Sequence, residues 1–167
     1  MRERLRSRET QLAVLHLADS GDDSFHTKII AADEAVLIFA PGHPFAQTAE
    51  LTTELLALEP WIQHEPASYL GDAADKWAQA NGVRLWNHAV VNSPEAHKRM
   101  VSEGGSVGLF SKAGIESELA LGSLCSAPLP GYQAEQSGFV LAWRKDHTLT
   151  PMQQAFIEIA GKSESAD

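Results

Sequence analysis

Six consecutive apolar residues, Ala35 to Ala40, run directly into the segment Pro41-Gly42-His43-Pro44, and this junction constrains the fold more than any other part of the sequence. A continuously apolar run of strand length is typical of a β-strand that is covered on both faces. The prolines that follow cannot continue such a strand. We therefore expect an interior strand that ends in a sharp change of direction, and we interpret Pro41, Gly42 and His43 as a hinge between two lobes.

Apolar periodicity on both sides of this junction predicts further strands and helices. The expected strands cover residues 12–17, 25–30, 35–40, 61–64, 85–91, 107–110, 124–129 and 139–143. The expected helices cover residues 52–58, 70–78, 94–101, 115–121 and 150–160, the last opened by a capping box at Thr150 and Gln153. Strands that alternate with helices indicate an α/β fold with largely parallel sheets. With 167 residues and 44% apolar content, the chain can bury the core of one domain or two small lobes.

The charge distribution argues against DNA binding by this chain alone. The sequence has 13 Lys and Arg residues against 22 Asp and Glu residues, for a formal net charge of −9. Four of the basic residues are arginines within the first eight positions, so 9 basic residues face 20 acidic residues after Thr10. A phosphate backbone is bound by clustered Lys and Arg, and an acidic surface repels it.

The basic start is followed by Glu9, Thr10 and Gln11 and then only a short apolar run, which argues against an export signal. No apolar stretch approaches the 18 or more residues that a membrane-spanning helix needs. Cys125 is the single cysteine, which excludes intramolecular disulfides and fits a reducing compartment. These features predict a cytoplasmic protein with no membrane partner.

The strongest enzymatic signal is the G-x-S-x-G pattern at Gly104, Ser106 and Gly108. In the nucleophile elbow of hydrolases, a strand precedes the serine and a helix follows it. Here the expected order is reversed, with a helix before Ser106 and a strand after it. The glycines are better explained as a helix stop and a tight turn, and we do not expect an enzyme.

Seven histidines raise the question of a metal site. No two of them stand three to five positions apart, and none forms a recognised zinc spacing with another ligand. Most are therefore expected on the surface or in loops. The acidic pairs Asp22–Asp23 and Glu116–Glu118 are typical of a solvated turn and a solvent-facing helix, and no glycine-rich phosphate loop is present. We expect neither metal nor cofactor.

Small polar residues follow three successive expected strands. Ser68 and Tyr69 follow the first, Asn92 and Ser93 the second, and Ser111 the third. In open α/β sheets, ligands bind outside the carboxyl ends of strands, where helix N-termini offer free amides and a partial positive charge. This position suits a carboxylate or another polar metabolite. The alternative, that each serine merely caps its own helix, stays open for every one of them.

The order of these segments resembles the effector-binding domain of LysR-type transcriptional regulators. The strand that runs into residues 40–44 is similar to the strand and His-Pro hinge of that family, and residues 92–101 resemble its serine-capped helix. Residues 104–110 are similar to its glycine turn and strand, and counterparts of its later segments stand at 115–119, 121–124 and 150–159. The resemblance covers about residues 8–160. Two residues depart from the resemblance. The family usually has glycine at the position of Ser106 and commonly has proline at the position of Ser111.

The resemblance implies a two-lobed fold of the periplasmic-binding-protein-like (type 2) class. Residues 1–41 would form part of the first lobe, residues 42–130 the complete second lobe, and residues 131–167 the return to the first lobe with a C-terminal helix. The family's N-terminal helix-turn-helix and the start of its first lobe are expected to be missing here. The incomplete lobe would then expose unpaired apolar strands, including 12–17 and 139–143, which favours a homo-oligomer.

The resemblance also implies the function of a sensor. A small polar or anionic effector would bind in the hinge cleft against Ser68, Tyr69, Asn92, Ser93, Phe110 and Ser111, and would shift the population of lobe arrangements that controls transcription in a full-length protein. Three alternatives remain open: a solute-binding protein of the same fold, a non-functional or split-gene remnant, and a serine hydrolase that uses Ser106.

Overall fold

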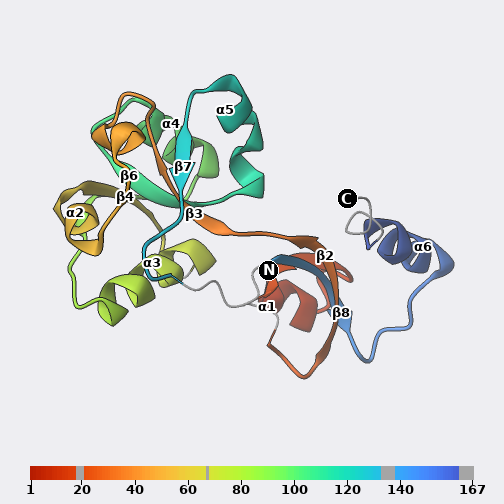
Figure 1. The fold of residues 1–167 in the computed structure, drawn as a ribbon. Coiled ribbons are helices and arrows are strands. Elements are labelled where there is room, and N and C mark those ends of the chain that lie inside the picture. Colours follow the sequence, from red (N-terminus) through yellow and green to blue (C-terminus); the bar gives the residue numbers. More distant parts are fainter. Residues whose placement is uncertain (18–20, 67, 133–137, 162–167) are drawn as a thin grey trace. The chain divides into compact units, whose positions relative to one another are not determined.

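The computed structural model describes residues 1–17, 21–66, 68–132 and 138–161, and the chain divides into two compact units (Figure 1). Unit 1 combines Met1–Asp33 with Glu135–Asp167, and unit 2 is Glu34–Ala134. The chain thus leaves unit 1 after Asp33 and returns to it after Ala134. Each unit has its own buried cluster of apolar side chains.

Unit 1 contains a three-stranded antiparallel sheet, and each of its two chain segments also contributes one helix. Its elements are α1 (Arg2–Arg6), β1 (Ala13–His16), β2 (Phe25–Ala32), β8 (Gly138–Arg144) and α6 (Pro151–Ala160). The strand order is β1-β8-β2. The expectation that residues 139–143 expose an unpaired edge is wrong, because β8 is paired on both sides. The edges of the described sheet are β1 and β2, where Val14 and Ile29 are exposed.

Unit 2 contains a five-stranded sheet with the strand order β5-β4-β6-β3-β7. Its strands are β3 (Ala35–Phe39), β4 (Pro60–His64), β5 (Trp86–Val91), β6 (Val107–Ser111) and β7 (Cys125–Ala127). Its helices are η2 (Pro44–Gln47), α2 (Thr53–Leu58), α3 (Tyr69–Ala80), α4 (Pro94–Ser102), η3 (Ala113–Ile115) and α5 (Glu116–Leu121). The elements expected from the sequence are therefore present, with small differences at their ends.

The expectation of largely parallel sheets is wrong for the strand pairs of the described residues. Strand β4 is parallel to β5 and β6, and β3 is antiparallel to β6 and β7. Strands that run parallel within one sheet need a long crossover, which α3 provides between β4 and β5, and α4 between β5 and β6. The chain comes from unit 1 just before β3 and returns to unit 1 after β7. Strand β3 runs in the opposite direction to its two neighbours, β6 and β7.

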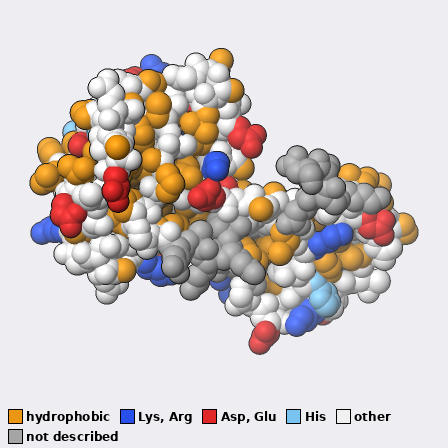
Figure 2. Space-filling view, viewed as in Figure 1, with side chains coloured by type: hydrophobic (Ala, Val, Ile, Leu, Met, Phe, Trp, Pro, Cys, Tyr) orange, Lys and Arg blue, Asp and Glu red, His pale blue; other side chains and the backbone are white. Residues whose placement is uncertain are grey.

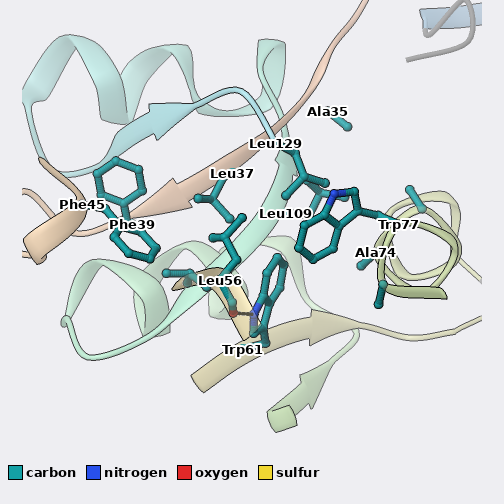
Figure 3. Close-up of a cluster of buried hydrophobic side chains, with 13 residues drawn as sticks. Ala35, Leu37, Phe39, Phe45, Leu56, Trp61, Ala74, Trp77, Leu109 and Leu129 are labelled. Atoms are coloured by element: carbon teal, nitrogen blue, oxygen red, sulfur yellow. Dashed lines mark hydrogen bonds between the residues drawn. The ribbon is translucent and has the colours of Figure 1, made fainter. Parts of the chain in front are cut away.

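Strand β3 is the interior strand that the apolar run predicts. All five of its residues are buried, and it pairs with β6 on one side and β7 on the other. Its alternate side chains contribute to two clusters. Leu37 and Phe39 pack with Trp61 and Trp77 on one face (Figure 3), while Ile38 belongs to the cluster on the other face.

The expected hinge residues lie inside unit 2 rather than at its boundary. Pro41, Gly42 and His43 follow the far end of β3, and the His43 ring accepts a hydrogen bond from the Phe45 amide at 3.2 Å, which caps η2. The division after Asp33 also differs from the expected boundary after residue 41. The reason is that β3 pairs with β6 and β7 and therefore belongs to the second unit.

Helix α6 has the capping box that the sequence predicts, since Thr150 and Gln153 bond to each other's backbone amides. Its apolar side chains are nevertheless largely exposed within the described part of the chain. Met152, Phe156 and Ile159 are 82%, 52% and 67% exposed, and Ile157 is the buried residue of the helix. Figure 2 shows hydrophobic side chains on the surface of both units.

Candidate functional site

Three strand ends meet at one edge of the unit 2 sheet. Strands β5, β4 and β6 are neighbours and run in parallel, so their carboxyl ends lie at the same edge. His64 at the end of β4 is in register with Val91 at the end of β5. We call this edge, with Ser68, Tyr69, Asn92, Ser93, Phe110 and Ser111, the carboxyl edge. The topology thus brings the polar turns predicted from sequence to one side of unit 2.

Each serine of the carboxyl edge caps its own turn. The Ser68 hydroxyl accepts a hydrogen bond from the Gly71 amide at 3.1 Å and donates to the Glu65 carbonyl at 2.6 Å. The Ser93 hydroxyl accepts from the Ala96 amide at 3.3 Å, and the Ser111 hydroxyl accepts from the Gly114 amide at 3.1 Å. Capping is therefore a role that all three serines fill, and a role toward an effector would come in addition to it.

The other residues of the carboxyl edge differ in accessibility. Asn92 is exposed, whereas Tyr69 is half-buried, with its hydroxyl 3.3 Å from that of Tyr132. Phe110 is only 5% exposed and belongs to the cluster around Ile38 and Val101. Phe110 consequently lies in the packing beneath the edge, and not on its surface.

Two helices begin at the carboxyl edge. Helix α3 has 12 residues and starts after Ser68, and α4 has 9 residues and starts after Ser93. A helix N-terminus carries unpaired amides and roughly half a positive charge, which favours an anion. On α4, Lys98 bonds to Glu95 at 3.0 Å and to Glu118 at 2.7 Å. The hydrogen bond with Glu118 raises the pKa of Lys98, so this lysine stays charged.

The chain enters unit 2 at the same edge. Ala35, the first residue of β3, is in register with Ser111. The Lys112 amide donates to the Glu34 carbonyl at 2.8 Å, and the Lys112 ammonium lies 3.2 Å from the Glu34 carboxylate. A molecule bound beside Ser111 would therefore adjoin the segment that links unit 2 to Asp33.

A cavity of about 520 Å³ lies at the opposite edge of the unit 2 sheet, where β4 and β6 begin. Its lining residues are Ala40, Pro41, Gly42, His43, Pro44, Glu59, Ser102, Glu103, Gly104 and Gly105. The carboxylates of Glu59 and Glu103 disfavour an anionic ligand there. The carboxyl edge, with two helix N-termini, suits an anion better than this cavity does.

The sequence did not indicate that two histidines, the buried His97 and the half-buried His64, pack together beneath the carboxyl edge. His97 on α4 is 0% exposed, and its ring centroid lies 4.1 Å from that of His64 on β4. His16 on β1 is also buried, so the expectation of mostly surface or loop histidines is wrong for His16 and His97, whereas His43 is buried but lies in the loop between β3 and η2. The helical spacing of His97 to Val101, which is fully buried on the same face, is the signal that could have placed it.

Ser106 lies between α4 and β6, so a helix precedes it and a strand follows it, as the sequence predicts. The residue is 4% exposed. Among the residues that the structure describes, no group of three or more His, Cys, Asp or Glu side chains could hold a metal ion. Within the same ranges, no helix is long and apolar enough to cross a membrane.

Comparison with known proteins places the chain in a family. Residues 1–164 match the LysR substrate binding domain. A RuBisCO operon transcriptional regulator of Acidithiobacillus ferrooxidans is 28% identical over 160 residues, which cover 93% of this chain and 50% of the regulator. The chain therefore spans half the length of this curated relative.

Solved structures show the same fold. The regulatory domain of CcmR from Synechocystis PCC6803 in complex with 2-PG has a TM-score of 0.86 at 18% identity, over 99% of this chain and 78% of that one. The effector-binding domain of QuiR in complex with shikimate has a TM-score of 0.78 at 19% identity, over 98% and 76% of the two chains. These neighbours agree with the periplasmic-binding-protein-like fold class expected from the sequence, and the match over residues 1–164 shows that this chain belongs to the LysR substrate-binding domain family.

Proposed function

We propose that this chain senses a small organic acid for a LysR-type transcriptional regulator, and that the acid binds at the carboxyl edge of unit 2. The observation that carries the proposal is the convergence of two helix N-termini, those of α3 and α4, with three hydroxyls at adjacent strand ends. Backbone amides and hydroxyls of this kind hold carboxylate and phosphate groups.

The solved relatives support an acidic ligand. One is in complex with shikimate and one with 2-phosphoglycolate (2-PG), and both molecules are organic acids. The net charge of this chain is −9, so its overall field repels an anion. Attraction must therefore come from groups close to the ligand, and the carboxyl edge provides the first turns of α3 and α4 with the adjoining Lys112 ammonium, which is paired with Glu34.

Regulation would follow from the position of this edge. The Lys112–Glu34 contacts join the edge to the segment by which the chain enters unit 2. An effector that binds one arrangement of this segment more tightly than another shifts the population between them, which is the physical requirement for a sensor. In the proposal, DNA contacts come from another part of a longer regulator, the protein acts in the cytoplasm where the DNA lies, and the buried Ser106 performs no catalytic step.

The test is calorimetric titration of the purified chain with shikimate and with 2-phosphoglycolate. Ser93→Ala and Ser111→Ala each remove a hydroxyl from the carboxyl edge. If that hydroxyl bonds to a charged ligand group, its loss weakens binding by about tenfold or more, because such a bond contributes roughly 1.5–3 kcal/mol. Ser102→Ala is the matched control, since Ser102 donates to the Arg99 carbonyl of its own helix and lines the opposite edge.

Binding that Ser102→Ala weakens as much as Ser93→Ala does would contradict the assigned location. Failure of both acids to bind at millimolar concentration would contradict the proposed ligand class for this chain. The two outcomes are distinguishable because the first retains heat of binding and the second gives none.

Self-association belongs to the same proposal. Strands β1 and β2 form the edges of the described sheet of unit 1, and they carry the exposed side chains of Val14 and Ile29. Helix α6 presents the exposed Met152, Phe156 and Ile159. Apolar edges and faces of this kind favour pairing with another chain. Light scattering that shows a monodisperse monomer, together with cooperative unfolding in calorimetry, would overturn this part of the proposal.

A further inference from the structure

The contact between α4 and the unit 2 sheet includes an imidazole pair with two unpartnered nitrogens. The Nε2 atom of His97 lies 2.6 Å from the carbonyl oxygen of Ile62. Because a carbonyl only accepts, Nε2 carries the proton, and Nδ1 is left with a bare lone pair. Nδ1 of His97 and Nε2 of His64 are both buried and have no hydrogen-bond partner among the described residues.

The surroundings of the pair are apolar. Phe110 stacks on His97 with ring centroids 5.4 Å apart and an interplanar angle of 15°, and its ring also lies 5.4 Å from that of His64. The cluster beneath the rings contains Val36, Ile38, Ile62, Val101, Ile115 and Leu124, with Ala89 and Val91 of β5 packed against it. A proton added to either ring would place a charge among these side chains.

No described carboxylate offsets that charge. On α4, Lys98 is bonded to Glu95 and Glu118, and Arg99 is bonded to Glu103. The residues that face the pair from β3, β5 and β6 are apolar or glycine. Among the described residues, His64 is the one titratable group whose charge shifts the pKa of His97, and its effect is repulsive.

The pair is too closely packed to bind a metal ion through both rings. Two imidazoles that share one tetrahedral ion have ring centroids roughly 5 Å apart, because each metal–nitrogen bond is about 2 Å long. The observed separation is 4.1 Å. The unpartnered nitrogens are therefore sites for a proton and not for a metal.

We propose that the His64–His97 pair is a proton-sensitive latch, which holds α4 against β4 while both rings are neutral and releases α4 when the medium is acidified. The latch is a property of unit 2 and does not depend on the proposed effector function. Since α4 begins directly after Ser93, its release would also disorder one side of the carboxyl edge.

The direction of the pH effect follows from burial. Burial, followed by repulsion from His64, lowers the pKa of His97 to about 4, and burial also lowers the pKa of His64. A histidine whose pKa is lowered in the folded state contributes its full stabilisation at pH values above its unfolded pKa. For His97 this stabilisation is lost as the pH falls from about 6.5 toward about 4. Between pH 7.5 and pH 5, His97 alone should raise the unfolding equilibrium constant of α4 roughly 30-fold.

The test is amide hydrogen exchange of the full chain at pH 7.5 and pH 5, corrected for intrinsic exchange rates. Wild-type α4 should lose about 30-fold in protection at pH 5, and at that pH it should exchange faster than β3, which reports on complete unfolding of unit 2. His97→Gln can still donate to the Ile62 carbonyl but cannot titrate, so the pH dependence of α4 should largely disappear. His88→Gln, at an exposed position of β5, is the matched control and should behave like wild type.

Protection of α4 at pH 5 that equals that of β3, or an unchanged pH dependence in His97→Gln, would overturn the latch. If His97→Gln does not fold, the ring proton resonances of the wild-type chain decide. The His97 ring must stay neutral at pH 5.5, where a histidine of ordinary pKa is largely protonated. A His97 ring that is mostly protonated at pH 5.5 overturns the proposal.

Discussion

Replacing Gly108 by alanine should destabilise unit 2, because a β-carbon at this position would overlap the His97 ring. It would lie 2.6 Å from Nε2 and 2.7 Å from Cε1 of His97, and 3.1 Å from the carbonyl oxygen of Ile62. Carbon atoms in contact are normally about 3.5–4.0 Å apart, so roughly 1 Å of overlap has to be relieved. The ring has little room to move, since it is hydrogen-bonded to Ile62 and stacked on Phe110.

The expected cost has two parts. Overpacking of a core typically costs about 1–3 kcal/mol, and loss of the His97–Ile62 hydrogen bond would leave a buried carbonyl unpaired at a similar cost. The smaller entropy of the unfolded alanine chain offsets about 0.4–1 kcal/mol. We therefore expect a net loss of about 2 kcal/mol, which lowers the Tm of a protein of this size by roughly 4–8 °C.

Denaturant unfolding, followed by tryptophan fluorescence, measures this loss directly. Gly42→Ala is the matched control, because a β-carbon at Gly42 meets nothing within 4 Å, and its stability should equal or slightly exceed that of wild type. The double variant Gly108→Ala/His97→Gln should be less destabilised than the sum of its single variants, since both changes act on the same ring. Stability of Gly108→Ala within about 0.5 kcal/mol of Gly42→Ala would refute the packing described for His97.

Three further predictions test the local structure of the two units. Trp61→Phe removes a buried hydrogen bond of 2.9 Å to a backbone carbonyl and should cost about 2–3 kcal/mol, whereas Trp86→Phe, at a 59% exposed position, should change stability by less than about 0.5 kcal/mol. Gly71→Ala should destabilise the chain although alanine favours helices, because the new β-carbon would collide with the Glu65 carbonyl; a gain in Tm would contradict this. Thr150→Ala should cost about 1 kcal/mol through loss of the capping box, and Thr150→Ser should restore most of it; equal stabilities of the two variants would argue against the cap.

The sequence predicts local structure in this chain well because the local signals are strong. The apolar run at Ala35–Phe39 forms a strand that is buried on both faces. Helix α4 begins at Pro94 after the capping residue Ser93, as the sequence predicts. Pairing direction could not be predicted in the same way. Whether β3 runs parallel or antiparallel to β6 depends on where the chain crosses between the units, and no local signal records that.

The boundary between the two units could not be predicted from local signals either. Pro41 and Pro44 end a strand whether or not a domain boundary follows, so the end of a strand was interpreted as a hinge between lobes. The chain passes from unit 1 to unit 2 after Asp33 without a comparable signal, because only Asp33 and Glu34 separate β2 from β3.

The polar turns of the candidate site could be predicted, whereas the support beneath them could not. Ser68, Ser93 and Ser111 follow strand ends in the sequence, and the topology of β5, β4 and β6 then brings them to one edge. The burial of His97 depends on Phe110 and on the missing side chain at Gly108. These residues are distant from His97 in sequence, so only the tertiary structure reveals the contact.

Amide NMR spectra of the chain, recorded during titration with 2-phosphoglycolate and with shikimate, test whether the carboxyl edge of unit 2 binds a small organic acid. We expect the largest saturable shifts at Ser68, Ser93 and Ser111, with the amides of Gly42 and His43 at the opposite edge unchanged. Saturable shifts confined to Gly42 and His43, or none up to millimolar ligand, would contradict it.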